Sequence, residues 1–512
     1  MNPAVLILLS FGGVALFYII SLFSKNAVGM KHIIISLTVV LNCGITNAQN
    51  ISGTWQGNLN IQANEIPVVF HIVKDSAGKL TASFDSPVQN AYNLPCREVI
   101  TKRDTVIFMM PILKGKYAGL LSAGKNQITG TWYQGAGSLP LTLNKTSDNV
   151  ILKEIKRPQT PRPPYPYNSQ DVEYFNADKS ISFGATITYP KTNSRIRYIK
   201  APVYPAVILI TGSGQQDRDE TIFDHKSFAV IADYLTKKGF VVLRVDDRGT
   251  GKTTGSFSAS TTADFVKDVE AGIDFLKTRP ETDKQKIGLI GHSEGGMIAP
   301  VVAASRNEIK YIVLLAGPGI PIVDLMTEQV EAVSASSGDS PAKVKAISSL
   351  FHQISVEVNK TKDSATLHKN ALMIVDKWAK SIDTAVLSAI GLTDRISREK
   401  YTTTQLAAVT SPWYKYFLAF NPKLYLQKLT CKVLALNGEK DIQVMARSNL
   451  AGIKKSLQKS KSPQYDVMEI PGLNHLFQTC IKCTADEYGE LEESFSPKAL
   501  EIMGNWLNKN VK

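Results

Sequence analysis

Residues 287–296 read Ile-Gly-Leu-Ile-Gly-His-Ser-Glu-Gly-Gly, so a short apolar run ends in the pattern Gly-x-Ser-x-Gly. This pattern is typical of a buried strand that turns sharply into a helix with a serine at its apex. Glycines flank such a turn because a side chain there would meet the neighbouring strand or helix. Ser293 is therefore a candidate nucleophile, and the backbone N–H of Glu294 is a candidate donor to an oxyanion. His292 is expected to point away from the serine and to pack against the sheet.

A serine nucleophile needs a histidine base, and that histidine needs a carboxylate partner. In sheets that carry this turn, the order along the chain is nucleophile, acid, base. A strand expected at 431–437 runs into a loop that ends in Asp441, and a strand at 465–470 leads to His475. No other histidine follows Asp441, so we predict Asp441 as the acid and His475 as the base. Glu439, in the same loop, is the alternative acid.

A second oxyanion donor is expected in the loop after an earlier strand. Residues 206–211 form an apolar run, and Gly-Ser-Gly follows it. The backbone N–H of Ser213 or Gly214 is the candidate donor, and the choice between the two stays open. Residues 217–219 read Asp-Arg-Asp and are interpreted as ion pairs that hold this loop, with substrate binding as the alternative. Phosphate binding is disfavoured because no Gly-Lys-Ser/Thr follows the glycines.

Together these motifs resemble the bacterial serine esterases of the α/β-hydrolase superfamily, close to its serine aminopeptidase and dienelactone hydrolase-like groups. The likeness covers about residues 170–510 and includes Val-Asp-Asp-Arg-Gly-Thr-Gly at 245–251, Ser-Pro-Trp-Tyr at 411–414 and Asn-His-Leu-Phe-Gln at 474–478. The resemblance implies an α/β-hydrolase fold and hydrolysis of carboxylic esters, usually with short acyl chains. It assigns Ser293, Asp441 and His475 as nucleophile, acid and base, and it implies no metal and no cofactor.

Composition places the chain among ordinary globular proteins. It has 512 residues, of which 44% are hydrophobic and 20% charged, and a formal net charge of +13 from 58 basic and 45 acidic residues. The basic residues are scattered and are interpreted as solvated helix faces, and no nucleic-acid-binding module is present. We therefore expect a small-molecule ester as the partner and no nucleic acid. The oligomeric state stays open.

The N-terminus has two apolar runs. The first, 3–23, is long enough to cross a bilayer. The second follows Met30-Lys31 and ends near Ala48, and it has the pattern of a secretory signal. We predict cleavage after Ala48 and export to the periplasm or the medium, with no stable membrane span in the mature chain. Met30 is the favoured start codon over a genuine extra anchor, and Cys43 leaves a lipoprotein as an alternative.

Export changes the interpretation of the cysteines. Cys480 and Cys483 lie just after the candidate base, and in an oxidising compartment this pair is expected to form a disulfide that stiffens the base loop. Free thiols are the alternative. A metal site would need two more soft ligands, which the sequence does not supply nearby. Cys431 is interpreted as a small buried apolar residue.

The pattern of apolar runs and turn residues divides the chain into segments. Short strands with turn residues between them predict a small antiparallel sheet or barrel, in which Gly-Thr-Trp at 53–55 and at 130–132 mark two strands that we expect side by side. Alternating strands and helices later in the chain predict a mainly parallel sheet covered on both faces. The predicted segments are a targeting segment (1–48), the β domain (49–150), a proline-rich linker (151–169), the α/β-hydrolase core (170–318 and 421–512) and a helical cap (319–420).

The cap is expected to stand over the serine. Trp413, Tyr414 and Phe417 are candidates for an acyl pocket, with helix packing as an equally acceptable interpretation. The favoured function is a serine carboxylesterase. One alternative is a peptidase of the aminopeptidase or prolyl type, in which a cap acid binds the substrate amine, and its candidates are Glu328, Glu331 and Glu357. A non-catalytic role, with the β domain as a binding module, is disfavoured by the intact set of Ser, Asp and His.

Overall fold

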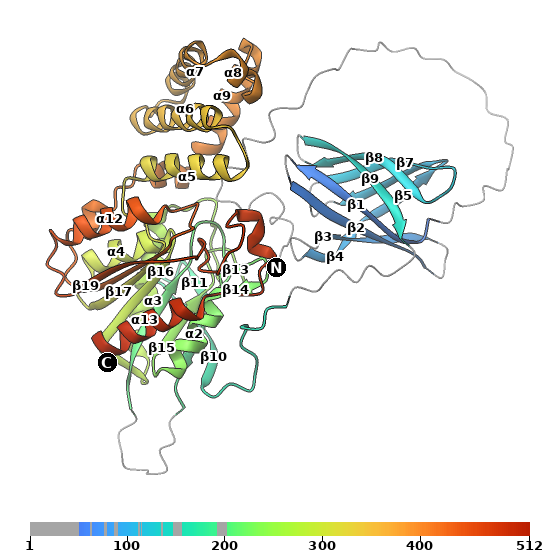
Figure 1. Cartoon of the computed structure of the whole chain (residues 1–512). Helices are drawn as coiled ribbons and strands as arrows, with labels where there is room; N and C mark the ends of the chain where they lie inside the picture. The colour runs from blue at the N-terminus through green and yellow to red at the C-terminus, as the bar shows by residue number, and fades with distance from the viewer. Residues whose placement is uncertain are drawn as a thin grey trace. The chain divides into compact units, whose positions relative to one another are not determined.

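The computed structural model describes residues 51–61, 64–75, 79–86, 91–110, 113, 115–134, 137–146, 156–191 and 202–512 (Figure 1). They belong to two compact units, residues 51–146 and residues 156–512. The predicted targeting segment, with its cleavage site after Ala48, the alternative start at Met30 and Cys43, lies outside the described residues. The beginning of the predicted linker, 151–155, does so too.

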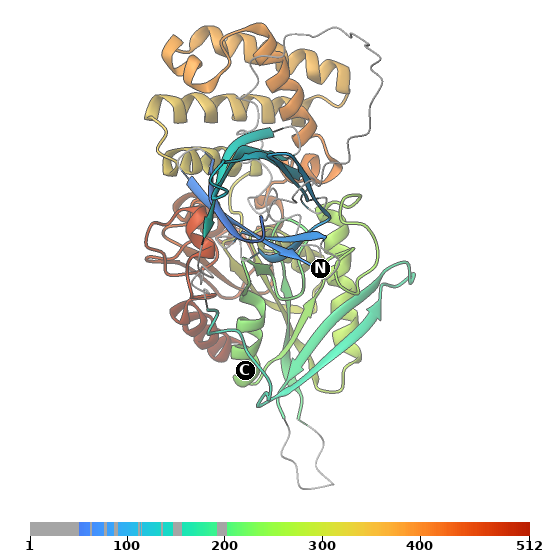
Figure 2. The ribbon, with the colours of Figure 1, turned by 90° about the vertical axis from the view of Figure 1, so that its right-hand side faces the viewer.

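Within residues 51–146 the structure describes a nine-stranded antiparallel sheet in the order β4-β3-β2-β1-β9-β8-β7-β6-β5. Its strands are β1 (Gly53–Ile61), β2 (Asn64–Lys74), β3 (Leu80–Ser86), β4 (Ala91–Cys96), β5 (Glu98–Lys102), β6 (Thr105–Met110), β7 (Gly115–Leu121), β8 (Gln127–Gln134) and β9 (Gly137–Thr146). The sheet curls until β3 contacts β5 and β4 contacts β6, which gives it the form of a barrel (Figure 2). The expected β domain is therefore present.

Aromatic rings fill the inside of this barrel. Phe70 and Phe108 are stacked with 4.4 Å between ring centroids, and the rings of Phe84 and Trp132 lie 5.3 Å apart. The two Gly-Thr-Trp strands are not side by side, as the sequence suggested, because β9 lies between β1 and β8. Trp55 and Trp132 nevertheless reach the same core, because both side chains are buried on the inner face of the curled sheet.

Residues 156–512 are built on an eight-stranded sheet in the order β10-β11-β15-β12-β16-β17-β18-β19. Its strands are β10 (Asn168–Phe175), β11 (Ser182–Tyr189), β12 (Tyr204–Ile210), β15 (Val241–Val245), β16 (Thr282–His292), β17 (Ile309–Leu315), β18 (Lys432–Gly438) and β19 (Tyr465–Ile470). The first two strands are antiparallel, and the other six are parallel to one another. The parallel strands are continuous apolar runs because helices cover both of their faces.

Several helices pack on this sheet. Residues of α3 (Thr262–Thr278), α4 (Gly295–Ser305) and α12 (Ala446–Leu457) share one apolar core with the strands. The helices α2 (Ser227–Lys237) and α13 (Pro497–Asn510) contact each other and the sheet. The chain therefore has the expected α/β-hydrolase fold, and the carboxyl ends of its parallel strands meet along one edge.

Between β17 and β18 the chain leaves the sheet and forms the stack of helices drawn above it in Figure 1. The stack contains α5 (Ile322–Ser336), α6 (Pro341–Lys360), α7 (Ser364–Ser381), α8 (Thr384–Ile390), α9 (Arg395–Val409) and α10 (Pro412–Leu418). Side-chain caps begin several of these helices, and Asp363 and Asp383 are examples. Among the described residues, no helix combines the length and apolar character that a membrane crossing requires.

The described part of the proline-rich segment is attached to the hydrolase unit along its length. The Arg157 guanidinium donates hydrogen bonds to the carbonyl oxygens of Phe223, Gly489 and Leu491, at 2.7 to 2.9 Å. Gln159 binds the carbonyl of Phe495 through its amide nitrogen at 2.7 Å. From Lys156 on, this segment therefore belongs to the hydrolase unit and is no free spacer.

Candidate active site

The turn that carries Ser293 is a strained elbow between β16, which ends at His292, and α4, which begins at Gly295. Ser293 has a φ of 53°, in the left-handed region that non-glycine residues seldom adopt. A Cβ atom added at Gly291 would lie 2.0 Å from the carbonyl oxygen of Gly295, and one added at Gly295 would lie 2.1 Å from that of Ile210. Only glycine fits at both positions, so the sequence pattern is a direct consequence of the close packing around the serine.

The predicted acid and base meet at the carboxyl ends of β18 and β19. His475 Nδ1 lies 2.8 Å from Asp441 Oδ2, and both side chains are buried. The second carboxylate oxygen of Asp441 accepts the backbone N–H groups of Gln443 and Val444 at 2.8 and 2.9 Å, which fixes the orientation of the carboxylate. A carboxylate accepts a hydrogen bond from the N–H at Nδ1, so Nε2 of His475 is the nitrogen that remains for proton transfer.

Glu439, the alternative acid, is turned elsewhere. Its side chain is exposed, pairs with Lys440 and accepts the backbone N–H of Gly472 at 3.1 Å. Among the described residues, its carboxylate makes no hydrogen bond to His475. The geometry favours Asp441 over Glu439 as the partner of the imidazole.

No hydrogen bond joins the candidate nucleophile to the candidate base among the described residues. Neither Ser293 Oγ nor His475 Nε2 makes a hydrogen bond with any described residue. The ring of His292, the residue before Ser293, lies 4.9 Å from the ring of His475 between centroids. Bonds between nucleophile and base are often long in a free enzyme and tighten when substrate is bound.

The loop after β12 lies against the nucleophile. A Cβ atom added at Gly212 would be 3.2 Å from Ser293 Cβ. The backbone N–H of Gly212 is held by Glu220 Oε1 at 2.8 Å, whereas no described residue accepts the N–H of Ser213 or Gly214. The N–H groups predicted as oxyanion donors on this loop are thus free to bind, and the geometry does not choose between them.

The backbone N–H of Glu294 is likewise without an acceptor among the described residues. The side chain of Glu294 is buried, and one of its oxygens accepts the hydroxyl of Thr262 at 2.7 Å and the indole N–H of Trp413 at 3.0 Å. Burial raises the pKa of Glu294 above its ordinary value, although these hydrogen bonds act in the opposite direction. Glu294 therefore connects the nucleophile elbow to α3 and to the cap helix α10.

The three aromatic candidates for an acyl pocket differ in their surroundings. Tyr414 and Phe417 are buried in the packing of α10, while Trp413 is only half-buried and stacks on Phe417 with 5.1 Å between centroids. None of the three lines the cavity that borders Glu294 and Gly212, whose walls include Phe183, Phe257 and Phe265. Of the three, Trp413 alone bonds to a residue of the elbow, through Glu294.

The three cap acids proposed for amine binding have hydrogen-bond partners within the protein. Glu328 accepts the hydroxyl of Ser448 at 2.5 Å, Glu331 that of Ser348 at 2.9 Å, and Glu357 that of Thr361 at 2.6 Å. Burial raises the pKa of Glu328, and the nearby acidic Glu331 and Asp324 raise it further, while the Ser448 bond only partly offsets these effects. The structure joins none of these carboxylates to the Ser293 loop by a hydrogen bond among the described residues.

Ion pairs hold the loop that follows Gly214. Arg218 forms a two-pronged bond to Asp246, with Nε–Oδ1 at 3.0 Å and Nη2–Oδ2 at 2.6 Å, and Asp219 pairs with Arg244. Asp217 accepts the backbone N–H and the hydroxyl of Thr221. The bonding of residues 217–219 agrees with the structural interpretation of this cluster, because each side chain is already engaged within the protein.

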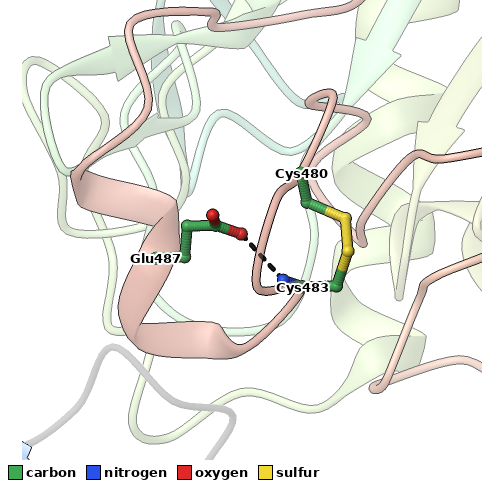
Figure 3. Close-up of side chains that lie close together, drawn as sticks. All are labelled: Cys480, Cys483 and Glu487. Atoms are coloured by element: carbon green, nitrogen blue, oxygen red, sulfur yellow. Dashed lines mark hydrogen bonds between the residues drawn. A yellow bond between two sulfur atoms is a disulfide. The ribbon is translucent and has the colours of Figure 1, made fainter.

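The loop after the base contains a disulfide between Cys480 and Cys483 (Figure 3). The carboxylate of Glu487 faces it and accepts the backbone N–H groups of Ile481, Lys482 and Cys483. Ligand atoms of Cys480, Cys483 and Glu487 all lie within 4.8 Å of one another. They fit a metal ion poorly, because the disulfide leaves no thiolate and the carboxylate oxygens already accept three N–H groups.

Two residues at the site were not found, or not understood, from the sequence. Glu220 is buried and bonded to the loop of Gly212, and His292 Nδ1 lies 2.9 Å from the same Glu220 oxygen. The Nε2 of His292 bonds to the backbone carbonyl of His475 at 3.0 Å, so both ring nitrogens have partners in neighbouring loops, which packing against the sheet does not describe. The only sequence signal was an acid directly after the charged run 217–219, where a surface ion pair is the simplest interpretation.

Comparison with known proteins finds sequence matches that cover part of the chain. The family model described as serine aminopeptidase, S33, matches residues 224–377. Esterase EstD of Thermotoga maritima is 33% identical over 128 residues, which are 25% of this chain and 30% of that protein, so the aligned part spans less than a third of EstD.

The solved structures that match this chain share little sequence with it. An esterase of Pyrococcus furiosus has 14% identity, covers 68% of this chain and 92% of its own, and has a TM-score of 0.38. Est1E of Butyrivibrio proteoclasticus, solved with ferulic acid, has 17% identity, covers 66% and 99%, and has a TM-score of 0.36. The chain therefore has an α/β-hydrolase fold preceded by an antiparallel β domain, and in part of its sequence it is similar to the serine aminopeptidase, S33, family and to an esterase.

Proposed function

We propose that this protein is a serine carboxylesterase in which Ser293, His475 and Asp441 form the catalytic triad. The observation that carries the proposal is the buried His475–Asp441 pair, 2.8 Å apart, at the sheet edge where the strained elbow presents Ser293. The esterase relative and the family match support hydrolysis as the reaction class.

In the proposed mechanism Ser293 Oγ attacks the ester carbonyl carbon while His475 Nε2 takes the hydroxyl proton. Asp441 stabilises the imidazolium that forms. The N–H of Glu294, with that of Ser213 or Gly214, binds the oxyanion of the tetrahedral intermediate. The imidazolium then gives its proton to the alcohol oxygen as the carbon–oxygen bond breaks. A water that His475 deprotonates attacks the acyl-enzyme, and the acid is released.

The test is Ser293→Ala with p-nitrophenyl acetate and with a fluorophosphonate probe. We expect kcat to fall by about 10⁴-fold or more, because the variant lacks the nucleophile, and the probe to leave the variant unlabelled. Ser305→Ala, at the far end of α4, is the matched control and should keep wild-type turnover. Normal turnover by Ser293→Ala would refute the triad.

The preference for short acyl chains is part of the proposal. A series of p-nitrophenyl esters from acetate to laurate measures it, with kcat/KM expected to be highest for the short members. A maximum at the long-chain end would refute this preference while leaving the triad untouched.

The description of the matching family favours one second candidate, an aminopeptidase that uses the same triad. Such an enzyme needs a carboxylate for the substrate amine, and Glu328 is the candidate to test, since of the three cap acids it is the one that bonds to α12, the helix that follows Asp441 in the chain. Aminoacyl-p-nitroanilides assayed beside the ester series decide between the two. Turnover of the anilides that is lost in Glu328→Gln but kept in Glu331→Gln would establish the aminopeptidase.

Export remains part of the proposal, with cleavage after Ala48. Sequencing the N-terminus of the mature protein tests it, and Gln49 is the expected first residue. A mature chain that begins well before Gln49 would refute this cleavage site.

A further inference from the structure

A buried series of hydrogen bonds connects the three loops that surround Ser293. Glu220 Oε1 accepts the backbone N–H of Gly212 at 2.8 Å and lies 2.9 Å from His292 Nδ1. On its other side, His292 Nε2 lies 3.0 Å from the backbone carbonyl oxygen of His475. The series therefore runs from the oxyanion loop, past the residue before the nucleophile, to the backbone of the base.

These contacts restrict where protons can be. A carbonyl oxygen only accepts, so Nε2 of His292 carries a proton. With that proton alone, Nδ1 would turn a lone pair toward a carboxylate oxygen of Glu220, which is unfavourable. The pair therefore holds one more proton, and an imidazolium facing a carboxylate satisfies every contact.

The surroundings favour the charged form of His292. Burial lowers the pKa of His292, but the Glu220 carboxylate, the carbonyl of His475 and the more distant Asp441 together raise it above its ordinary value. On the other side of the pair, burial together with the nearby Glu294 and Glu220 raises the pKa of Asp247. His292 and Glu220 are 5% and 3% exposed, so solvent hardly screens their interaction.

We propose that His292 and Glu220 act as a positioning pair, which holds the backbone of His475 and the oxyanion loop in place relative to Ser293. The pair thereby lowers the energy of the transition state and does not contribute to substrate binding. This inference rests on the proposed esterase function. Gly212 directly precedes the candidate donors Ser213 and Gly214, so its anchor sets where their N–H groups point. Ser293 Oγ does not hold the imidazole, so the position of the ring depends on Asp441 and on the backbone that His292 holds.

Glu220→Gln tests the pair because both of its contacts converge on one oxygen. A glutamine oxygen can accept hydrogen bonds from the Gly212 N–H and from a protonated Nδ1 of His292. A neutral His292 ring with its proton on Nδ1, however, has none on Nε2 and loses its bond to the His475 carbonyl. If the amide nitrogen faces Nδ1 instead, Gly212 loses its acceptor. One of the two loops is released in either case.

The measurement is steady-state hydrolysis of p-nitrophenyl acetate, with active sites counted by fluorophosphonate labelling so that unfolded protein does not enter kcat. We expect Glu220→Gln to lower kcat by about 10- to 100-fold, as small misplacements of catalytic groups do, with KM changed by no more than about threefold. Glu308→Gln, which removes a carboxylate from an ion pair with Arg306 beyond the far end of α4, should keep both constants. If Glu220→Gln does not fold, His292→Gln replaces it, because one amide cannot bond both Glu220 and the carbonyl, and the same result is expected.

The outcomes separate the two proposals. A wild-type enzyme that neither reacts with the probe nor hydrolyses esters refutes the proposed function, and the positioning role falls with it. A wild-type enzyme that is labelled, with kcat unchanged in Glu220→Gln, refutes only the positioning pair. An increase in KM alone, with kcat per labelled site unchanged, also refutes it, because the pair would then act in substrate binding.

Discussion

The indole N–H of Trp413 donates a hydrogen bond to the carboxylate of Glu294, with 3.0 Å between Nε1 and Oε1. Glu294 directly follows the nucleophile, and Trp413 lies in the first turn of the last cap helix, α10. The same oxygen also accepts the hydroxyl of Thr262. The cap is thus joined to the elbow by a bond to a buried carboxylate, where the loss of one donor is costly.

Trp413→Phe removes this donor but keeps an aromatic ring that can stack on Phe417. We expect the free energy of unfolding to fall by about 1 to 3 kcal/mol, because Glu294 stays buried with one donor fewer. The ratio of kcat/KM between long and short acyl esters should change as well, since α10 loses its attachment to the elbow. Urea unfolding and the ester series measure the two effects.

Trp506→Phe is the matched control for this variant. It removes an indole bond of the same kind, to Asp466 at 2.7 Å, on α13. A comparable loss of stability with an unchanged ester preference is expected. An ester preference that changes equally in both variants would contradict a special role for Trp413.

Gly295→Ala should prevent the hydrolase unit from folding stably. The new Cβ would lie 2.1 Å from the carbonyl oxygen of Ile210, which belongs to a central strand and cannot move aside. We expect a loss of more than about 4 kcal/mol, seen as insoluble protein or a collapsed thermal transition. Gly338→Ala is the control. Its Cβ would have no atom within 4 Å, so only its positive φ of 81° disfavours the alanine, by about 1 kcal/mol. Equal losses in the two variants would contradict the steric argument.

The parts of the molecule that the sequence predicted are those set by local patterns and by chain order. The strands expected at 431–437 and 465–470 are found as β18 and β19 to within one residue, because their apolar runs are clear. The strands β4 and β5 were not predicted. They are the two edges of the barrel sheet, where β4 contains Pro95 and β5 is mostly exposed, so neither has the alternation of a half-buried strand.

The site shows the same division. Order along the chain was enough to choose Asp441 and His475, whereas the role of Glu220 depends on a loop that folds back on Gly212 and His292. No spacing in the sequence encodes that return. The wrong pairing of the two tryptophan strands has a similar cause, because repeated motifs do not reveal which strand lies between them.

His225 is expected to make the protein less stable in acid. Burial, helped by the nearby Arg157, lowers its pKa to about 4 from an ordinary value of 6.5, despite a bond to the carbonyl of Tyr488. The unfolded chain thus binds the proton more tightly than the folded protein does. The stability that neutral His225 contributes is complete above pH 6.5 and is lost as the pH falls toward 4, by about 3 kcal/mol.

His225→Gln tests this dependence, because glutamine does not titrate in that range. Its free energy of unfolding is expected to be lower than that of the wild type at pH 8 and to approach the wild-type value at pH 4. Urea unfolding at several pH values gives the difference between the two proteins, in which the carboxylates common to both cancel. A difference that stays constant from pH 8 to pH 4 would show that His225 does not titrate as expected.

The disulfide after the base is expected to brace its loop only modestly. Closing the short loop from Cys480 to Cys483 lowers the conformational entropy of the unfolded chain, which raises the free energy of the unfolded state by about 2 kcal/mol. In the folded state Glu487 holds the same loop through three backbone N–H groups, so the loop should survive reduction. Dithiothreitol should therefore lower the free energy of unfolding of the wild type by about 2 kcal/mol and leave ester hydrolysis nearly unchanged.

Replacing both cysteines and replacing the carboxylate separate the two supports. The double variant Cys480→Ser/Cys483→Ser should match the reduced wild type and should not respond to dithiothreitol. Glu487→Gln puts an amide group in place of one accepting oxygen, so dithiothreitol should lower its esterase activity as well as its stability. Iodoacetamide checks the reduction, because Cys96 and Cys431, whose thiol pKa burial raises to about 12, stay unreacted in the folded protein. Full activity of reduced Glu487→Gln would show that neither support is needed to hold His475 in place.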